Sequence, residues 1–287
     1  MSKWKSNHVR LVVSLCLITS VNWIIAGCAG IRSSGSAGDP QAAASPSPSP
    51  SPFSGYLTWK NDNARTGLQP NETQLTPANV NAVQFGMKFA NPVDGWTYAQ
   101  PLYMANLTVG GAQHNVVFVA TEHDSVYAFD ADAAGPPLWH RSFLGPGITT
   151  VPTAGNNLIP VQPEVGITST PVIDAASGTL YVLAQTVENG VNFPSKLHAL
   201  DITSGAEKAG SPAVLSDPVF DGEQEFERSA LLLANGNVYV AFASYGDILP
   251  YHGFIFAFDA STLAKVAVWN VTSSGGEGGI WMGGQNR

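Results

Sequence analysis

The sequence has few positive charges and almost no cysteine. Lys and Arg together number 13 among 287 residues, against 21 Asp and Glu, which gives a formal net charge of −8. Proteins that bind nucleic-acid backbones need a basic surface, so this balance argues against a nucleic-acid partner. The two cysteines, Cys16 and Cys28, both lie near the N-terminus. The remainder of the chain therefore contains no disulfide.

Long amphipathic helical patterns are missing as well, outside the extreme N-terminus. Only 12% of the residues are charged and 44% are hydrophobic, while 29 Gly and 20 Pro supply many turns. This composition is typical of short strands joined by tight turns. The sequence therefore predicts an all-β fold.

The N-terminus carries an export signal. Lys3, Lys5 and Arg10 precede an uncharged run over residues 11–27, "LVVSLCLITSVNWIIAG". A basic segment followed by an apolar one is the pattern of a signal peptide, and this run is at the short end of the lengths that span a bilayer. The sequence therefore favours a cleaved signal over a permanent transmembrane helix.

The end of this run, "IIAGCAG", resembles the lipobox of bacterial lipoproteins. The resemblance implies cleavage after residue 27 and lipid attachment to Cys28, which would make the protein peripheral to a membrane. Ala29 after the cysteine implies the outer membrane as the destination, facing either the periplasm or the cell surface. Residues 28–55, with "SPSPSPSP" at 45–52, then predict an extended linker before a globular part at 56–287.

The globular part repeats one unit. The segment "NVVFVATEHDSVYAFDA" at 115–131 corresponds to segments at 178–202 and 236–260, and each copy has an apolar run before it and another after it. Four short strands per copy, repeated along the chain, predict a β-propeller of four-stranded antiparallel blades, with three complete blades. From the aromatic residue of the second strand to the aspartate of the third, the copies measure 12, 20 and 20 residues.

Two residue types recur at fixed places in these copies. Asp130, Asp201 and Asp259 each end a predicted third strand, where a carboxylate can accept backbone N–H bonds of the turn. Trp139 and Trp269 fall on predicted fourth strands, where a large ring can fill space against the next blade. We interpret both sets as structural.

The copies resemble the pyrroloquinoline-quinone (PQQ) repeat family of β-propellers. The segments "FVATEHDSVYAFDA" and "LYVLAQ…LHALD" carry the resemblance, which covers residues 56–287, and "RTGLQPNETQLTPANV" and "GGIWMGG" also look like stretches of exported bacterial propellers. By resemblance, quinoprotein dehydrogenases hold calcium and the quinone at the centre of an eight-bladed ring, often beside a vicinal cysteine pair. This chain has no vicinal cysteines, and no acid–Asn–Asp calcium set aligns with it.

Side chains on the approach to each blade's first strand are the candidate ligand contacts, because that strand lines the channel of a propeller. The sequence predicts contacts at the channel mouth from Gln100, Glu164, Thr168, Arg228 and Trp281, with Tyr98, Thr170 and Glu227 beside them. The alternative is that these groups only bond one another and channel water.

No known catalytic or metal-binding motif is present. Residues 121–125, "TEHDS", predict a solvated turn, since three adjacent side chains in a tight turn do not converge easily on one ion. His198 and His252 fall in or next to strands and are interpreted as structural. No Gly-x-Ser-x-Gly elbow, Walker loop or His-Glu-x-x-His motif occurs, so no catalytic residue is assigned.

Together these features predict a lipid-anchored propeller with a binding or scaffolding role at the bacterial cell envelope, its partner an envelope protein or a glycan. The alternative is a quinoprotein-type oxidoreductase that uses PQQ with calcium. Residues 56–287 suffice for three to four blades, whereas rings of four to eight are usual. We therefore expect the chain to be the N-terminal part of a longer protein, a compact four-bladed ring being the alternative.

Overall fold

The computed structural model describes residues 9–13, 55–70, 72–153 and 161–281, and these residues form strands and turns without a helix. Within these ranges there is accordingly no helix long and apolar enough to cross a membrane. The all-β prediction is confirmed. The signal peptide, Cys28 and the serine–proline linker lie almost entirely outside the described residues.

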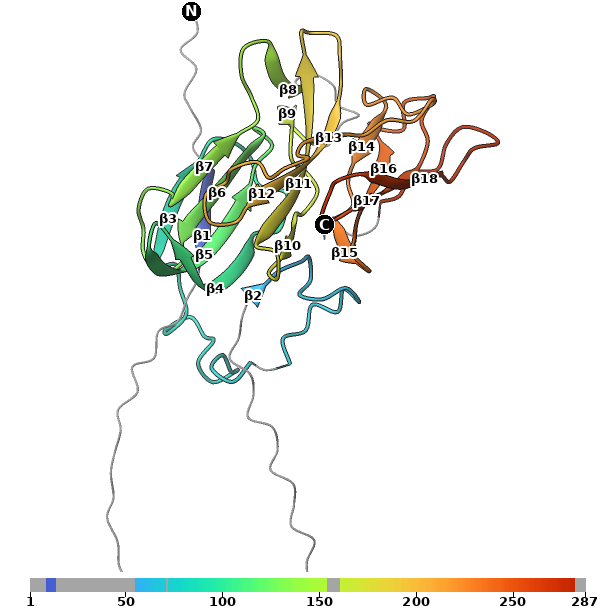
Figure 1. Ribbon diagram of the computed structural model, residues 1–287. Helices are drawn as coiled ribbons and strands as arrows, with labels where there is room; N and C mark the ends of the chain where they lie inside the picture. Colours follow the sequence, from blue (N-terminus) through green and yellow to red (C-terminus); the bar gives the residue numbers. More distant parts are fainter. Residues whose placement is uncertain (1–8, 14–54, 71, 154–160, 282–287) are drawn as a thin grey trace, which may run out of the picture.

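Three antiparallel sheets follow one another across the molecule in chain order (Figure 1). The first blade runs, from its inner to its outer edge, through β4 (Leu102–Val109), β5 (Ala112–Ala120), β6 (Ser125–Asp130) and β7 (Trp139–Ser142), and β2 (Gly55–Tyr56) pairs with β4.

The second and third blades repeat this meander. The second contains β10 (Val172–Asp174), β11 (Thr179–Glu188), β12 (Ser195–Asp201) and β13 (Ala213–Val214), with β8 (Ile148–Pro152) and β9 (Glu164–Val165) added at the far end of β11. The third contains β14 (Glu225–Glu227), β15 (Leu232–Ala234), β16 (Asn237–Ser244), β17 (Phe254–Asp259) and β18 (Lys265–Asn270). A separate pair is formed by β1 (Val9–Val13) and β3 (Phe89–Val93).

The central strands are buried on both faces because neighbouring blades pack against them. One apolar cluster joins the first blade to the second, and another, rich in phenylalanine, joins the second to the third. In β11 every residue except the last is buried. This explains why the strand sequences form continuous apolar runs instead of alternating.

The predicted role of the outer-strand tryptophans is confirmed for one of them. Trp139 is 8% exposed, and its Nε1 donates to the carbonyl of Ile202 in the second blade at 3.0 Å. A Cβ on Gly205 would fall 2.6 Å from the Trp139 ring, so the ring lies directly on the glycine of that turn. Trp269 is 62% exposed, and the prediction that it packs on a further blade is not met within the described residues.

The segment from Leu57 to Arg65 contacts all three inner edges. The carbonyl of Leu57 accepts from the Ile173 amide in β10 at 2.8 Å, and Arg65 donates to the carbonyl of Leu231 at 3.0 Å. The Lys60 amide donates to Gln100 at 3.1 Å, just before β4. The segment therefore ties the blades together, and it is visible below β10 and β15 (Figure 1).

Each blade has two distinct ends, which position its polar residues. We call the end where the second and third strands of a blade join, as at residues 121–124, the hairpin end. The inner strand of each blade is antiparallel to the second strand, so the connection that enters the inner strand also lies at the hairpin end. We call the opposite end, where β6, β12 and β17 finish at an aspartate, the aspartate end.

Candidate functional site

Polar residues occupy equivalent positions on the three connections that enter the inner strands. Each lies four residues before a first inner-strand residue: Tyr98 before Leu102, Thr168 before Val172 and Arg228 before Leu232. Because the blades repeat, this spacing brings the three side chains to the hairpin end of the molecule. They surround a group of buried carboxyls.

Glu122 lies at the centre of this group and has no exposed surface. Its Oε2 accepts from the Gly166 amide at 3.0 Å and from the Thr168 hydroxyl at 2.9 Å, both on the connection into the second blade. Burial raises the pKa of Glu122 to about 7, although these two bonds and the Arg228 guanidinium oppose the rise. The first blade is thereby joined to the second through a carboxyl that holds its proton near neutral pH.

Glu227 joins the second and third blades in the same way, as a buried acceptor of hydrogen bonds. It is fully buried, and it accepts from the Thr168 amide at 2.9 Å and from the Ser169 hydroxyl at 3.3 Å. Burial raises its pKa well above the ordinary value, and the nearby Glu122 and Asp124 contribute to the rise. Thr168 thus contacts both carboxyls, one through its hydroxyl and the other through its backbone.

Asp124 corrects the sequence interpretation of residues 121–125. Both Glu122 and Asp124 are fully buried, so the prediction of a solvated turn is wrong. The cause is the connection into the second blade: a Cβ on Gly166 would fall 2.8 Å from the Asp124 carboxyl carbon, so the chain passes directly over this turn. Burial raises the pKa of Asp124 well above its ordinary value, and neither of its carboxyl oxygens has a hydrogen-bond partner among the described residues.

Gln185 and Tyr245 complete the network and were not found by sequence reasoning. Gln185 Oε1 accepts from the Glu227 amide at 3.1 Å and from the Tyr245 hydroxyl at 3.0 Å. Its Nε2 donates to the carbonyl of Glu225 at 2.9 Å. A polar residue near the end of the apolar β11 run was the available signal for Gln185, whereas nothing local distinguishes Tyr245 from other core aromatics.

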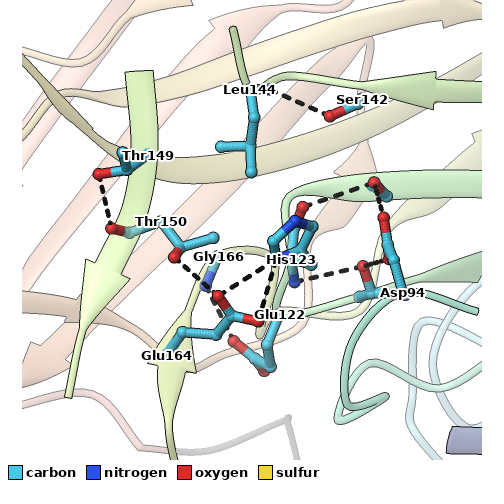
Figure 2. A network of polar contacts seen from close by, with 11 residues as sticks. Asp94, Glu122, His123, Ser142, Leu144, Thr149, Thr150, Glu164 and Gly166 are labelled. Carbon is cyan, nitrogen blue, oxygen red and sulfur yellow. Dashed lines mark hydrogen bonds and ion pairs between the residues drawn. The ribbon is translucent and has the colours of Figure 1, made fainter. Parts of the chain in front are cut away.

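His123 and Glu164 form a partly accessible pair at the hairpin end (Figure 2). The Nδ1 of His123 lies 3.1 Å from Glu164 Oε1, and the two side chains are 41% and 21% exposed. The hydroxyl of Thr150 donates to Glu164 at 2.8 Å, which fixes the carboxylate in place. On the other side of the turn, Asp94 accepts from the hydroxyls of Thr121 at 2.9 Å and Ser125 at 2.5 Å.

The predicted contact residues divide into two groups. Glu164, Thr168 and Arg228 lie in or beside the network described above. Gln100 lies outside this network. Its backbone amide donates to the Thr170 hydroxyl at 2.9 Å. Trp281 is 44% exposed. Whether any of the five binds a ligand stays a prediction.

The remaining sequence candidates have structural partners. His198 is buried, its Nδ1 lies 2.7 Å from Glu207, and its ring stacks on Phe143. His252 Nδ1 lies 3.1 Å from the Thr272 hydroxyl. In the described ranges, no three His, Cys, Asp or Glu side chains are grouped so that they could hold a metal ion.

Comparison with known proteins supports the fold alone. No family model matches the sequence, and no curated protein matches it. Among solved structures, quinohemoprotein alcohol dehydrogenase from Comamonas testosteroni matches with a TM-score of 0.51 and 19% identity, over 75% of this chain and 27% of that one.

Two further solved structures match less closely. Quinohemoprotein alcohol dehydrogenase ADHIIG from Pseudomonas putida HK5 gives a TM-score of 0.47 at 18% identity, over 76% of this chain and 26% of its own. A europium-containing methanol dehydrogenase gives 0.40 at 12% identity, over 65% and 36%. The chain spans about a quarter to a third of the length of these proteins. Its described part has the fold of β-propeller blades.

Proposed function

We propose that the protein is an exported, lipid-anchored binding module of the bacterial cell envelope, with its ligand face at the hairpin end. The observation that supports this most is the convergence of three blades on one hydrogen-bonded network around Glu122 and Glu227. Such a network holds the loops in fixed positions, and a rigid face loses little conformational entropy when a ligand binds.

The chemistry of the face indicates the class of ligand. His123 and Glu164 are partly accessible polar groups of this face and Asp94 is an exposed one, so both donors and acceptors are available there. A hydroxylated ligand such as a glycan, or a polar loop of an envelope protein, would match these groups. The overall negative charge disfavours polyanionic ligands.

The test is a glycan array probed with the purified chain, followed by titration of any glycan that binds. His123→Ala and Glu164→Gln should each weaken that binding about 5- to 50-fold, as expected for lost polar contacts in a site. The matched control is His114→Ala, because His114 pairs with Asp130 at the aspartate end, at 2.8 Å. Binding that survives both hairpin-end substitutions would refute this face as the ligand site.

The anchor is a separate part of the proposal. It rests on the resemblance of "IIAGC" to a lipobox, and the outer membrane is proposed from Ala29. Cys28→Ser should abolish incorporation of a labelled fatty acid and leave the unprocessed precursor. Continued labelling of the Ser variant would disprove lipidation at this residue.

A quinoprotein oxidoreductase is the second candidate, and the fold of the Comamonas enzyme supports it. The fit to its cofactor is incomplete, since the described residues include no metal-holding group of three His, Cys, Asp or Glu. The unpartnered buried oxygens of Glu122 and Asp124 are the only feature of the network that a cation would suit. Calorimetric binding of PQQ with Ca²⁺, together with dye reduction in the presence of an alcohol, would favour this candidate over the binding module.

A further inference from the structure

Three buried carboxyls from two blades gather at the hairpin end. Glu122 and Asp124 lie in the turn between β5 and β6, and Glu227 is the last residue of β14. None of the three has any exposed surface. Glu122 and Asp124 both raise the pKa of Glu227, so a charge on one member is felt by another. We call these three residues the buried acid cluster.

Asp124 is the member of the cluster that has no donors. Glu122 and Glu227 each accept two hydrogen bonds from residues 166–169. Among the described residues, neither carboxyl oxygen of Asp124 has a hydrogen-bond partner, and neither does Oε1 of Glu122. A buried carboxylate without donors is much less stable than the neutral acid, because nothing replaces the water that solvated it. The position of Asp124 therefore suits a carboxyl that holds its proton.

The charges around the cluster do not compensate a charge on Asp124. Arg228 is the permanent cation beside the cluster, and it lowers the pKa of Glu122. Asp94 and Glu164, by contrast, raise the pKa of Asp124. The other titratable groups that face the cluster are His123, which pairs with Glu164, and the tyrosines Tyr98 and Tyr245. In the described part of the chain one guanidinium thus faces three carboxyls, and a second negative charge in the cluster is repelled.

The segment of residues 166–169 lies directly on the cluster. A Cβ on Gly166 would fall 2.8 Å from the Asp124 carboxyl carbon, so nothing fits between the two residues. Two amides of the segment donate to the other two carboxyls, and the Ile167 amide donates to the carbonyl of Thr121 at 3.2 Å. Displacement of this segment therefore breaks these contacts and exposes Asp124 to water.

We propose that the packing of residues 166–169 on the first blade depends on pH. The segment stays in place while the buried acid cluster holds its protons, and it moves off and admits water as rising pH removes them. Ionisation costs less in the open arrangement, because water then solvates each carboxylate, and the protons pass to solvent. This device concerns the packing of the blades and does not depend on the proposed ligand face.

Hydrogen exchange followed by NMR on the purified full chain tests the proposal. Between pH 5.5 and 7.5, the protection factors of the Ile167 and Thr168 amides should fall at least about tenfold after correction for intrinsic exchange. An opening that releases one proton becomes up to about tenfold more favourable with each pH unit. The amides of β11 should remain more protected than these two at both pH values, because the opening is local.

Two substitutions identify the groups responsible. Asp124→Asn and Glu122→Gln each remove one titrating carboxyl while keeping the shape of the side chain, so each should make the fall in Ile167 protection at least about threefold smaller. Asp132→Asn is the matched control, because Asp132 is an exposed aspartate of the same blade, and it should leave the pH profile unchanged.

The wild-type profile tests the proposal even where a variant does not fold. Protection of Ile167 and Thr168 that stays constant from pH 5.5 to 7.5 would overturn it. So would protection equal to that of the β11 amides at pH 7.5, since the segment then opens only when the whole domain unfolds. A fall of the same size in the wild type, Asp124→Asn and Glu122→Gln would show that the buried acid cluster does not control the segment.

Discussion

The two ends of the blades use the same chemical group in opposite ways. At the hairpin end, Glu122 and Glu227 are buried between blades, and burial raises the pKa of both. At the aspartate end, Asp201 and Asp259 close turns, and turn hydroxyls and amides lower the pKa of both; for Asp201 they do so against partial burial. Burial thus favours the protonated form of the carboxyls that join blades, whereas the turn donors favour the anionic form of those that shape turns.

The difference shows what decides the role of an acid in this fold. A turn carboxylate has its donors within three residues, as when Thr203 and Ser204 donate to Asp201. The inter-blade carboxyls Glu122 and Glu227 have their donors about 40 to 60 residues away, on the connection that enters the second blade. Local donors stay near solvent, whereas distant ones arrive only when two blades pack and exclude water.

The largest effect should come from removing an inter-blade acceptor. Glu227→Ala leaves the buried Thr168 amide and Ser169 hydroxyl without an acceptor, so we expect a loss of about 2–4 kcal/mol in the free energy of unfolding. Urea unfolding at a mildly acidic pH measures it, because burial raises the pKa of Glu227 and so favours the neutral carboxyl in the wild type.

Glu227→Gln is the control for this substitution. It keeps an oxygen that can accept from the Thr168 amide, so it should cost less than about 1 kcal/mol. If Ala and Gln destabilise equally, Glu227 does not act as an acceptor between blades.

The next effect concerns pH. The pKa of Glu122 is about 7 in the folded protein against an ordinary value of 4.5, so the folded state binds its proton more tightly. Its contribution to stability is therefore complete below about pH 4.5 and disappears as pH rises through 7. Between pH 5 and 8.5 the wild type should lose about 2–3 kcal/mol on account of this group.

Glu122→Gln sharpens this measurement because it removes the titration and keeps an acceptor for Gly166. Between about pH 5 and 6.5 its unfolding free energy should decline less steeply with pH than that of the wild type, by a slope equivalent to about one bound proton per molecule, and the difference in slope should fade above pH 7. Parallel pH profiles of the two proteins would show that Glu122 is not protonated in the folded state at neutral pH.

The sequence predicted the aspartate end well. Asp130, Asp201 and Asp259 recur at the ends of aligned strands, and their partners are immediate neighbours in the sequence. The repeat also predicted the four strands of each blade and the packing of Trp139. In these cases the information lies within one repeat, so a single sequence suffices.

The sequence could not predict the burial of Glu122 and Asp124. Their turn has the composition of a solvated hairpin, and they are buried because Gly166 passes over it. The exposure of Trp269 has a related cause, since Trp139 is covered by Gly205 from the following blade. Both outcomes depend on which chain segment lies next to the residue. The sequence of the residue's own repeat does not identify that segment.

A smaller effect is expected from the turn carboxylates. Asp201→Ala removes the acceptor of the Thr203 amide and of the Thr203 and Ser204 hydroxyls. These groups lie near solvent, and water can replace part of what they lose, so we expect about 0.5–1.5 kcal/mol in urea unfolding at pH 7. Asp201→Asn should restore most of it, because the amide oxygen can accept the same bonds. A loss as large as that of Glu227→Ala would contradict the distinction between the two ends.

The smallest effect on stability should come from Asp259, which nevertheless gives the clearest contrast in ionisation. Its Oδ1 accepts from the Ser261 and Thr262 amides at 3.0 and 2.9 Å and from both hydroxyls at 2.6 and 2.9 Å. These bonds favour the anion and lower the pKa of Asp259 below the ordinary aspartate value of 3.8. The stability they supply is therefore present above about pH 4 and is lost as the pH falls through the lowered pKa.

Carbon-detected NMR of the carboxyls should show Asp259 titrating in that acid range and Glu122 titrating near pH 7. Asp259→Asn should leave the melting temperature at pH 7 nearly unchanged and remove only the acid titration, whereas an Asp259 signal that titrates above pH 4 would show that the turn donors do not hold its anion.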